Sequence, residues 1–336
     1  MALNSVVIRK ISIIGDGGWG TTLAIHLSRQ KYPVTLWGAF PDNIAQSTKS
    51  RENKKFLPGI KIPSQVRLTS DIDEAIGFGD LIVLSAPSEY LTDTLSKIQK
   101  TAYKGKVFVS VVKGIHPKSF KRMSEIILEY LPKVPLVVLS GPTIAGEVAL
   151  GIPTTAVAAC RDEKLASRIQ KVFNSDSFRI YTNTDVVGVE FGGSVKNVIA
   201  LACGICDGLK LGTNAKAAVL TRGLVEITRL GMSLGARQET FYGLSGLGDL
   251  VTTCFSPSSR NRTVGEALGR GQKIKDVLGH MHAVAEGVVT ADAVYHLAKK
   301  KKINMPIVTE VYKIIFKNKS PETAMKDLMG RALKSE

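Results

Sequence analysis

The chain has 336 residues, of which 44% are hydrophobic, and a formal net charge of +16. This length suffices for one large domain or two ordinary domains, each with its own core. Four irregularly spaced cysteines exclude a disulfide framework and a paired metal-binding motif, so we expect a cytoplasmic protein without a metal site. The positive charge favours an anionic partner but does not identify it.

Nucleic acid and membranes are disfavoured as partners. The densest basic stretches, KSRENKK and the four lysines at 299–302, have no interleaved aromatic residues that could stack on bases. They fit solvated surfaces, so we expect no nucleic-acid binding. The start, MALNSVVIRK, has no leader pattern, and we expect no apolar run to be long enough to span a bilayer. We therefore expect no membrane insertion.

Short apolar runs rich in β-formers alternate with amphipathic segments from residue 10 to about 182. These runs are ISIIG, VTLW, VRLT, DLIVLSAP, KVFVSVVKG, PLVVLSGP, TTAVAA and FRIYT. Strands that are apolar on both faces and separated by helices predict a parallel sheet covered on both sides. We therefore expect an α/β domain over residues 1–188.

The pattern becomes helical from residue 189 onward. Long stretches rich in Ala, Leu and Gly, such as GSVKNVIALACGICDGL, show helical periodicity with no strand between them. Residues 189–336 are therefore predicted to form an all-helical C-terminal domain. We find no internal repeat and no low-complexity linker between the two domains.

A glycine loop follows the first predicted strand. Gly15, Gly17 and Gly20 fit the pattern G-x-G-x-x-G, between ISII and a helix that starts near Thr21. Gly15 permits the tight turn, Gly17 lets a pyrophosphate approach the backbone, and Gly20 allows close helix–strand packing. Phosphates would bind at the helix N-terminus, which favours negative charge. The context predicts a Rossmann-type doubly wound sheet that binds a nicotinamide dinucleotide.

The end of the second predicted strand leaves the choice between NAD and NADP open. An acidic residue there usually contacts the ribose of NAD, and a basic residue accommodates the extra phosphate of NADP. Residues 37–40 are Trp-Gly-Ala-Phe and offer neither. Lys49, Lys54 and Lys55 could supply positive charge from the next loop, although solvated surface lysines are the simpler interpretation.

Two lysines stand out by their surroundings. Lys113 directly follows the apolar strand VFVSVV, at the sheet edge where ligands bind in open α/β sheets. Lys196 lies among small and apolar residues on a predicted helix. Burial or a nearby cation lowers a lysine pKa toward neutrality, which suits proton transfer. The alternative is a lysine whose stem is buried and whose amine reaches solvent at the rim of a helix pair.

A glycine-framed acid and a basic loop follow. Asp249 stands in GLSGLGDL, and the loop SSRNR contains Ser259, Arg260, Asn261 and Arg262. Such donors just before a helix match a phosphate or a phosphorylated substrate. The alternative is a loop of turn-forming residues with a solvated arginine pair.

Two other pairs carry less weight. Cys203 and Cys206 form a C-x-x-C without a second pair, which favours two packed thiols. His280 and His282 lie two residues apart without a carboxylate at metal-ligand spacing, which argues against zinc.

Taken together, these stretches resemble the bacterial NAD(P)-dependent glycerol-3-phosphate dehydrogenases almost from end to end. The resemblance rests on GDGGWGTTLA, LPGIKIP, SVVKGI, SGPTIAGEVA, EFGGSVKNVIALACGICDGLKLGTNAKAA, GLSGLGDLVTTC, SSRNRTVGEALGRG and AEGVVTADAV. It implies reversible reduction of dihydroxyacetone phosphate to sn-glycerol 3-phosphate. It also implies supply of phospholipid precursors and a homodimer.

The resemblance assigns roles to individual residues. It implies that Lys196 is the proton donor and acceptor. It implies substrate contacts from Lys113, Gly141, Thr143, Lys196, Asp249, Ser259, Arg260 and Asn261. It implies cofactor contacts from Gly18, Trp19, Lys113, Ala145, Arg260, Val284 and Glu286. In this scheme Lys113 polarises the carbonyl and Asp249 orients a lysine and balances its charge.

Two departures from the family pattern concern the cofactor. Asp16 stands where relatives usually have Ala, and it brings a negative charge beside the pyrophosphate loop, at a cost in affinity unless it faces away. Gly18 replaces a usual Ser. Ala39, followed by Phe40, stands where many relatives have a basic residue, which puts NADP preference in doubt.

Two alternative functions compete with this one, the first within the same chemistry and the second in a different class. Another hydroxyacid dehydrogenase, such as a phosphogluconate or hydroxyacyl-CoA enzyme, would use a different substrate loop, and SSRNR and GLGDL speak against it. A dinucleotide sensor or nucleic-acid-binding module would need neither Lys113 nor Lys196. The presence of both lysines therefore favours an enzyme over a sensor or a nucleic-acid-binding module.

Overall fold

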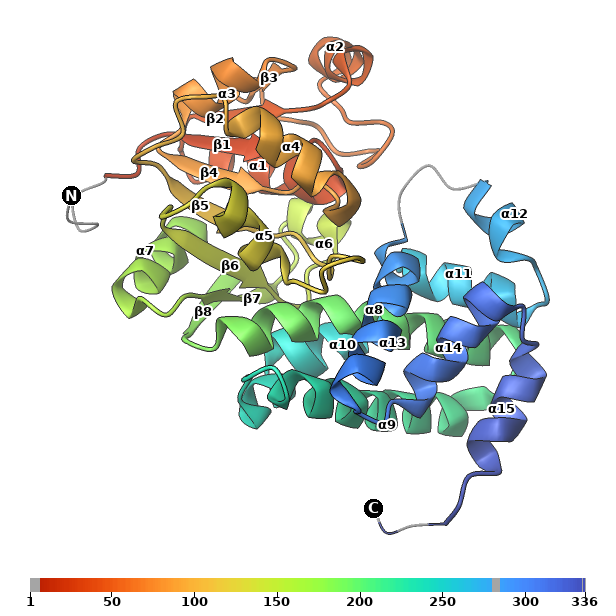
Figure 1. Cartoon of the computed structure of the whole chain (residues 1–336). Helices are drawn as coiled ribbons and strands as arrows, with labels where there is room; N and C mark the ends of the chain where they lie inside the picture. The colour runs from red at the N-terminus through yellow and green to blue at the C-terminus, as the bar shows by residue number, and fades with distance from the viewer. Residues whose placement is uncertain (1–6, 280–284, 334, 336) are drawn as a thin grey trace. The chain divides into compact units, whose positions relative to one another are not determined.

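The computed structural model describes residues 7–279, 285–333 and 335, and the chain divides into two compact units (Figure 1). Unit 1 consists of Met1–Lys113 and Lys121–Val189. Unit 2 consists of Gly114–Phe120 and Glu190–Glu336. The sequence places one boundary, between residues 188 and 189, and does not separate the segment 114–120 from the first domain.

An eight-stranded sheet forms the centre of unit 1, in the order β3-β2-β1-β4-β5-β6-β7-β8. Each predicted apolar run corresponds to one strand: β1 (Ile11–Ile14), β2 (Val34–Trp37), β3 (Arg67–Thr69), β4 (Leu81–Leu84), β5 (Val107–Ser110), β6 (Leu136–Ser140), β7 (Thr154–Ala159) and β8 (Phe178–Asn183), the last of which extends one residue beyond its run. The Rossmann-type α/β fold is therefore confirmed.

One part of the sheet prediction is wrong. Strands β1 to β6 run parallel, and β8 is parallel to β7, but β7 pairs antiparallel with β6. An apolar run reports that a strand is buried on both faces, but it carries no information about the direction in which the strand runs. The expectation of a parallel sheet therefore holds for the other strand pairs and fails at the β6–β7 pair.

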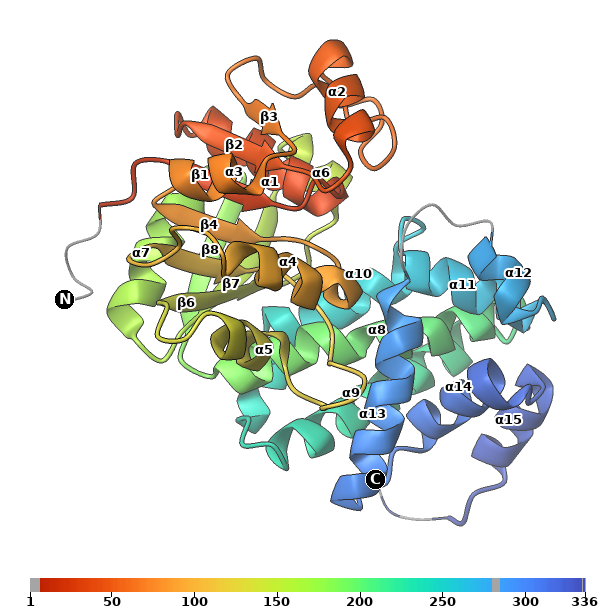
Figure 2. The ribbon, with the colours of Figure 1, turned by 45° about the horizontal axis from the view of Figure 1, so that its top comes forward.

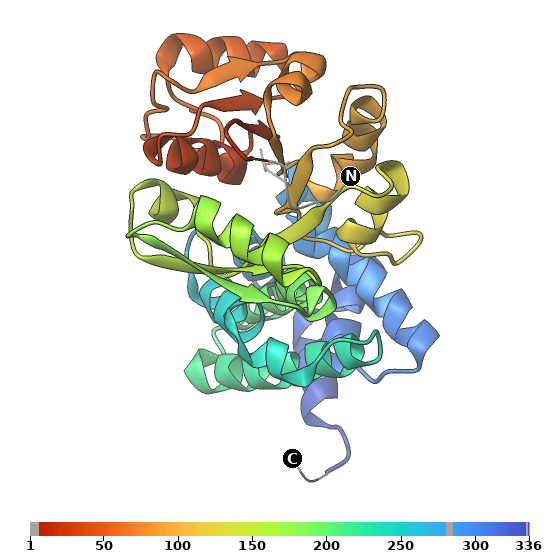
Figure 3. The same cartoon turned by 90° about the vertical axis from the view of Figure 1, so that its left-hand side faces the viewer.

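Alternate strand residues enter two separate cores, which explains the continuous apolar runs. In β4, Leu81 and Val83 join one buried cluster and Ile82 and Leu84 join the other. Side chains of α1 (Gly18–Arg29) and α7 (Glu163–Phe173) complete the first cluster, and those of α3 (Ile72–Phe78), α4 (Leu91–Ile98) and α5 (Met123–Tyr130) complete the second. Figure 3 shows helices on both faces of the red and orange strands. The helices of unit 1 are α1 (Gly18–Arg29), α2 (Pro41–Ser50), α3 (Ile72–Phe78), α4 (Leu91–Ile98), α5 (Met123–Tyr130), α6 (Ala145–Ala149) and α7 (Glu163–Phe173), with a short 3₁₀ turn η2 (Ser88–Tyr90).

Unit 2 consists of helices and turns in its described part, as predicted for the C-terminal domain (Figure 2). Its helices are α8 (Val186–Gly208), which begins in unit 1, α9 (Gly212–Met232), α10 (Asp249–Phe255), α11 (Arg260–Gly269), α12 (Ile274–Gly279), α13 (Glu286–Lys301), α14 (Pro306–Lys317) and α15 (Pro321–Met329). A 3₁₀ turn, η3 (Gln238–Tyr242), and a single π-helical turn, η4 (Leu244–Gly248), precede α10.

Helix α8 is the central helix of this unit. Its 23 residues are long and apolar enough to cross a membrane. The expectation that no run reaches that length is therefore wrong. However, 89% of the apolar part of the helix is buried, so its apolar surface is already covered by protein, as in the core helix of a globular unit.

Candidate active site

In the glycine loop of unit 1, one glycine requires an unusual torsion angle and another leaves no room for a side chain, whereas the third is open. Gly15 has a φ of +121°, a conformation that favours glycine. A side-chain carbon at Gly20 would overlap the carbonyl oxygen of Gly15. In contrast, a side-chain carbon at Gly17 would have no described atom within 4 Å. The loop is therefore tight on its inner side and open at Gly17.

Helix α1 begins at Gly18, three residues before the expected start near Thr21. Gly18, Trp19 and Gly20 thus form its first turn, and Gly17 caps it without a side-chain hydrogen bond. The first turn contains no acidic residue. Because the first amides of a helix have no partner within the helix and carry partial positive charge, this end fits an anionic diphosphate.

Ala145 lies beside the start of α1. Its carbonyl oxygen accepts a hydrogen bond from Thr22 Oγ1 at 2.9 Å. Its Cβ lies 3.8 Å from the place where a side-chain carbon at Gly18 would be. Trp19 makes an edge-to-face contact with Phe178, with ring centroids 6.3 Å apart. Unit 1 therefore brings Gly18 and Ala145, two of the predicted cofactor residues, together.

Lys113, Gly141 and Thr143 also lie together, where the neighbouring strands β5 and β6 end. Lys113 Nζ donates to the carbonyl oxygen of Gly141 at 3.3 Å. The same oxygen accepts from Thr143 Oγ1 at 3.2 Å. The carboxyl ends of parallel strands meet at one edge of a sheet, which is why three residues from two segments converge. All three were predicted to contact substrate.

Unit 2 contains a buried ion pair between Lys196 on α8 and Asp249 at the start of α10. Only 5% of Lys196 and 1% of Asp249 is exposed. The ammonium donates to Asp249 Oδ1 and, at 2.6 Å, to Thr253 Oγ1. A buried ammonium needs such partners, because leaving water is costly for a charge. The expected lysine contact of Asp249 is thus with Lys196, and Lys196 does not reach solvent at a helix rim.

A glycine on α8 allows the acid to reach the lysine. Gly192 lies one helical turn before Lys196, so both face the same side of α8. A side-chain carbon at Gly192 would lie 2.9 Å from the carbonyl oxygen of Ser245, in η4. Because Gly192 has no side chain, η4 can lie against α8, and the residue that follows it, Asp249, is delivered beside the ammonium.

Thr253 is a polar partner that the sequence analysis missed. Its hydroxyl donates to the carbonyl oxygen of Asp249 at 2.7 Å and accepts from Lys196. Residues four apart on a helix lie on the same face. The spacing from Asp249 to Thr253 in GDLVTTC was therefore the signal that could have identified it.

The basic loop starts α11. Ser259 caps the helix by accepting from the amide of Arg262 at 3.3 Å. Arg260, the first residue of the helix, is exposed. Asn261 is buried, and its Oδ1 accepts from the amide of Gly287 at 2.9 Å. The side-chain oxygen of Asn261, a predicted substrate-binding residue, thus links the start of α11 to the start of α13.

Arg262 has a structural partner. Its Nε lies 2.6 Å from Asp207 Oδ2, and Lys216 Nζ binds the same carboxylate at 2.8 Å. The idea of a solvated arginine pair in SSRNR therefore fails for Arg262. Arg260 and Arg262 occupy different environments although they lie two residues apart.

Of the remaining predicted residues, Glu286 is the first residue of α13. Val284 lies outside the described residues, as do His280 and His282. In the described ranges, no group of three or more His, Cys, Asp and Glu side chains could hold a metal ion.

The cysteines are buried and free, as expected for packed thiols. Burial raises the pKa of Cys206 to about 12. The hydrogen bond with Cys254 and burial both raise the pKa of Cys203. These thiols therefore remain protonated at neutral pH, which argues against metal binding or redox chemistry.

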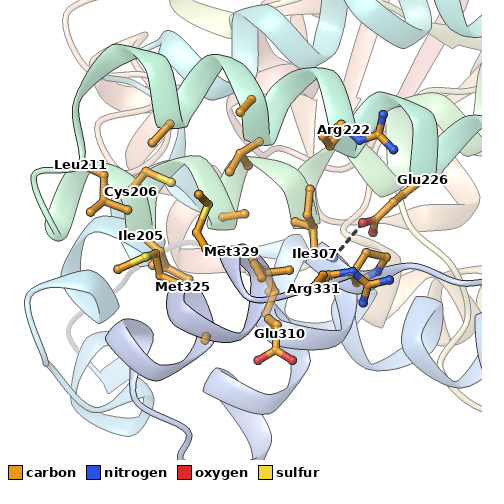
Figure 4. A pocket seen from close by; sticks show the side chains of 18 of the residues that line it. Ile205, Cys206, Leu211, Arg222, Glu226, Ile307, Glu310, Met325, Met329 and Arg331 are labelled. Atoms are coloured by element: carbon orange, nitrogen blue, oxygen red, sulfur yellow. Dashed lines mark hydrogen bonds between the residues drawn. The ribbon is translucent and has the colours of Figure 1, made fainter. Parts of the chain in front are cut away.

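Unit 2 also contains an apolar cavity of about 760 Å³ between α8, α9, α14 and α15 (Figure 4). None of the predicted substrate residues lines it. One of the carboxylates that line it, Glu226, accepts from the amides of Ile307 at 2.8 Å and Val308 at 3.2 Å, and so satisfies the start of α14. Burial raises the pKa of Glu226 to about 7. The cavity is therefore separate from the residues that carry the expected chemistry.

Comparison with known proteins identifies the family. Residues 10–166 match the family model described as NAD-dependent glycerol-3-phosphate dehydrogenase N-terminus, and residues 185–326 match the corresponding C-terminus. A glycerol-3-phosphate dehydrogenase [NAD(P)+] of Chlorobium limicola is 47% identical over 329 residues, which cover 97% of this chain and 99% of that protein. One of Geobacter sulfurreducens is also 47% identical, over 97% of this chain and 98% of its own.

Solved structures agree. The crystal structure of glycerol-3-phosphate dehydrogenase from Coxiella burnetii matches with a TM-score of 0.93 and 36% identity, over 96% of this chain and 99% of that one. A yeast glycerol-3-phosphate dehydrogenase matches with a TM-score of 0.81 and 27% identity, over 96% and 99% of the two chains.

Proposed function

The chain belongs to the NAD-dependent glycerol-3-phosphate dehydrogenase family and is an NAD(P)-dependent oxidoreductase for glycerol 3-phosphate, and from this premise we propose how its residues divide the reaction. In the biosynthetic direction dihydroxyacetone phosphate becomes sn-glycerol 3-phosphate. The reduced dinucleotide supplies a hydride to the ketone carbon, and the protein supplies a proton to the ketone oxygen.

Lys196 is proposed to donate that proton, and to accept it in the reverse direction. The observation that carries this role is the buried contact of its ammonium with Asp249 and Thr253. A neighbouring carboxylate favours the charged form of the amine and fixes its direction. Asp249 thus has two roles: it balances the charge of Lys196 and it orients the donor.

Lys113 is proposed to polarise the ketone and to stabilise the negative charge that develops on oxygen. Its hydrogen bond to the carbonyl oxygen of Gly141 holds the amine at the ends of β5 and β6. Thr143 binds the same carbonyl oxygen and is proposed to contact substrate with Gly141. A preorganised donor of this kind can lower a barrier by about 3 kcal/mol.

Arg260, Ser259 and Asn261 are proposed to hold the substrate phosphate. Support comes from the exposed guanidinium of Arg260 at the N-terminus of α11, where helix amides also favour an anion. Because Asn261 Oδ1 is engaged by Gly287, its amide nitrogen would be the group that binds phosphate. The substrate phosphate therefore accounts for the positive charge of this loop, and no nucleic-acid partner needs to be invoked.

The cofactor is proposed to bind at the glycine loop and the start of α1. Gly15, Gly17 and Gly20 shape the loop, and Gly18, Trp19 and Ala145 lie at its helical side. Arg260, Lys113, Val284 and Glu286 complete the proposed set by family resemblance. We further propose a cytoplasmic homodimer without membrane insertion that supplies phospholipid precursors.

The main test is the variant Lys196→Ala. Loss of the proton donor should lower kcat at least a thousandfold, measured as NADH absorbance in the presence of dihydroxyacetone phosphate. The affinity for NADH, measured by titration without substrate, should change less than threefold, because the proposed cofactor residues are untouched. Lys216→Ala is a matched control, since it removes another buried lysine that pairs with a carboxylate, Asp207. Near-normal turnover of the Lys196→Ala variant would show that Lys196 is not the proton donor.

A further inference from the structure

The carboxylate of Asp16 lies where the second strand of the sheet ends. Asp16 stands between Gly15 and Gly17 in the glycine loop, and only 7% of it is exposed. A side-chain carbon added at Gly38, the residue after β2, would lie 2.5 Å from Cγ and 2.6 Å from Oδ2 of Asp16. The carboxylate therefore fills the space that a side chain at the end of β2 would otherwise take.

Contacts from two other segments fix Asp16 in this place. Asn43 Nδ2, on α2, donates to Asp16 Oδ2 at 2.6 Å. Asn53 Nδ2 donates to the main-chain oxygen of Asp16 at 2.6 Å, and Thr21 Oγ1 donates to the same oxygen at 3.2 Å. Burial raises the pKa of Asp16, while the hydrogen bond from Asn43 and the charge of Lys55 oppose this rise. Both the main chain and the side chain of Asp16 are thus held.

The end of the second strand is the place where dinucleotide-binding units distinguish NAD from NADP. An acidic side chain there accepts a hydrogen bond from the ribose hydroxyls of NAD, and a basic one accommodates the 2′-phosphate of NADP. The segment 37–40, Trp-Gly-Ala-Phe, has no charged side chain. The negative charge at this place comes instead from the glycine loop, about twenty residues earlier in the chain.

We propose that Asp16 takes over the role of the acidic residue at the end of β2, together with Asn43, and that its charge repels a 2′-phosphate, so that the enzyme prefers NAD to NADP. This inference rests on the proposed cofactor site. A fixed like charge is an effective way to reject one of two related ligands, because the rejected ligand must give up hydration without gaining a partner.

Lys55 is the cation whose charge acts on Asp16, and it could in principle attract a phosphate. Its ammonium lies over the rings of Phe40 and Phe56, 5.7 Å and 5.0 Å from their centroids. Lys55 is exposed, so water and salt screen its charge more strongly than that of the buried Asp16. At the end of β2 the negative charge of Asp16 therefore outweighs the positive charge of Lys55.

The test is direct binding of NADH and NADPH by calorimetry, without substrate. The unmodified protein should bind NADH at least tenfold more tightly than NADPH. Asp16→Asn, which keeps the size of the side chain, should tighten NADPH binding at least tenfold and change NADH binding much less. Ala39→Arg should improve NADPH binding more strongly in the Asp16→Asn background than alone, because the competing charge is then gone.

The control is Asp42→Asn, which removes an exposed acid from the first turn of α2 and should leave the NADH/NADPH ratio unchanged. Equal binding of the two dinucleotides by the unmodified protein would overturn the proposal, and this measurement needs no variant. A similar change of both affinities in Asp16→Asn would also overturn it. Turnover does not enter these titrations, so an error in the role of Lys196 would not affect them. Failure to bind either dinucleotide would overturn the cofactor site as well.

Discussion

The glycine loop of unit 1 and the Lys196 cluster of unit 2 reach function by opposite means. The loop depends on missing side chains: Gly20 lets α1 approach Gly15, and open space lies next to Gly17. The cluster depends on side chains that are present and buried, Lys196 and Asp249 above all. One site therefore fails when atoms are added and the other when atoms are removed.

The largest expected effect comes from adding one carbon to the loop. In Gly20→Ala the new methyl group would overlap the carbonyl oxygen of Gly15, so the loop or α1 must shift. We expect a loss of at least 2 kcal/mol in the free energy of unfolding, measured with urea, together with weaker NADH binding.

Gly17→Ala separates the effect on stability from the effect on NADH binding. Its methyl group would point into open space, so stability should change by less than about 1 kcal/mol while NADH binds at least tenfold more weakly. Gly146→Ala, also in open space but in α6, is the control for adding a methyl group. If Gly17→Ala binds NADH normally, the pyrophosphate does not lie against this glycine.

The glycine loop and the Lys196 cluster also differ in how much of them the sequence could predict. The loop was found because glycine spacing between a strand and a helix is a local pattern. For its neighbour Asp16 the sequence left open whether the side chain faces the pyrophosphate or points away, and its carboxylate lies at Gly38 and Asn43. Sequence identifies the residue but not the direction of its side chain, which depends on α2 and β2.

For the cluster, the residue patterns pointed to Lys196 and Asp249 individually, but they did not show that the two side chains contact each other. The pairing depends on Gly192, which lets η4 lie against α8 across 53 residues of chain from Lys196 to Asp249. Likewise, the eight strands were found from local burial, whereas the reversed direction of β7 depends on a connection that leaves no periodic signal. Long-range geometry was therefore the part that sequence reasoning could not supply.

Unit 2 also contains a buried acid, Glu226, whose protonation affects the stability of the fold, so that this effect can be measured as a function of pH. The folded pKa of Glu226, about 7, lies above its ordinary value of 4.5 because of burial. Folding then favours the protonated acid, so its stabilising contribution is complete below pH 4.5 and is lost as pH rises through 7. The expected loss is roughly 3 kcal/mol.

Glu226→Gln should therefore flatten the fall in unfolding free energy between pH 5 and pH 8. The charges of Arg229 and Arg331 act in the opposite direction to burial, and both are retained in the variant. Glu239→Gln, an exposed acid in η3, is the control and should leave the pH dependence unchanged. Parallel pH profiles for Glu226→Gln and the unmodified protein would contradict the assignment.

A smaller effect is expected for the phosphate loop. Arg260→Ala should raise KM for dihydroxyacetone phosphate about tenfold to a hundredfold, since a charge-assisted hydrogen bond contributes roughly 1.5–3 kcal/mol. Steady-state kinetics at saturating NADH measures this. Arg270→Ala is the control, because Arg270 lies at the opposite end of α11 and pairs with Glu266, and it should leave KM unchanged. An unchanged KM in Arg260→Ala would discredit the phosphate assignment.

The smallest effect, and the sharpest test of the buried cluster, concerns Thr253. Thr253→Val keeps the shape of the side chain but removes the oxygen that accepts from Lys196 at 2.6 Å. If the hydroxyl orients the ammonium, kcat should fall about tenfold with an altered pH profile, and NADH binding should stay the same. Thr253→Ser should restore both kcat and the profile, because it retains the oxygen. A loss of melting temperature with an unaltered pH profile would instead assign Thr253 to the stability of α10, where its hydroxyl also binds the carbonyl oxygen of Asp249.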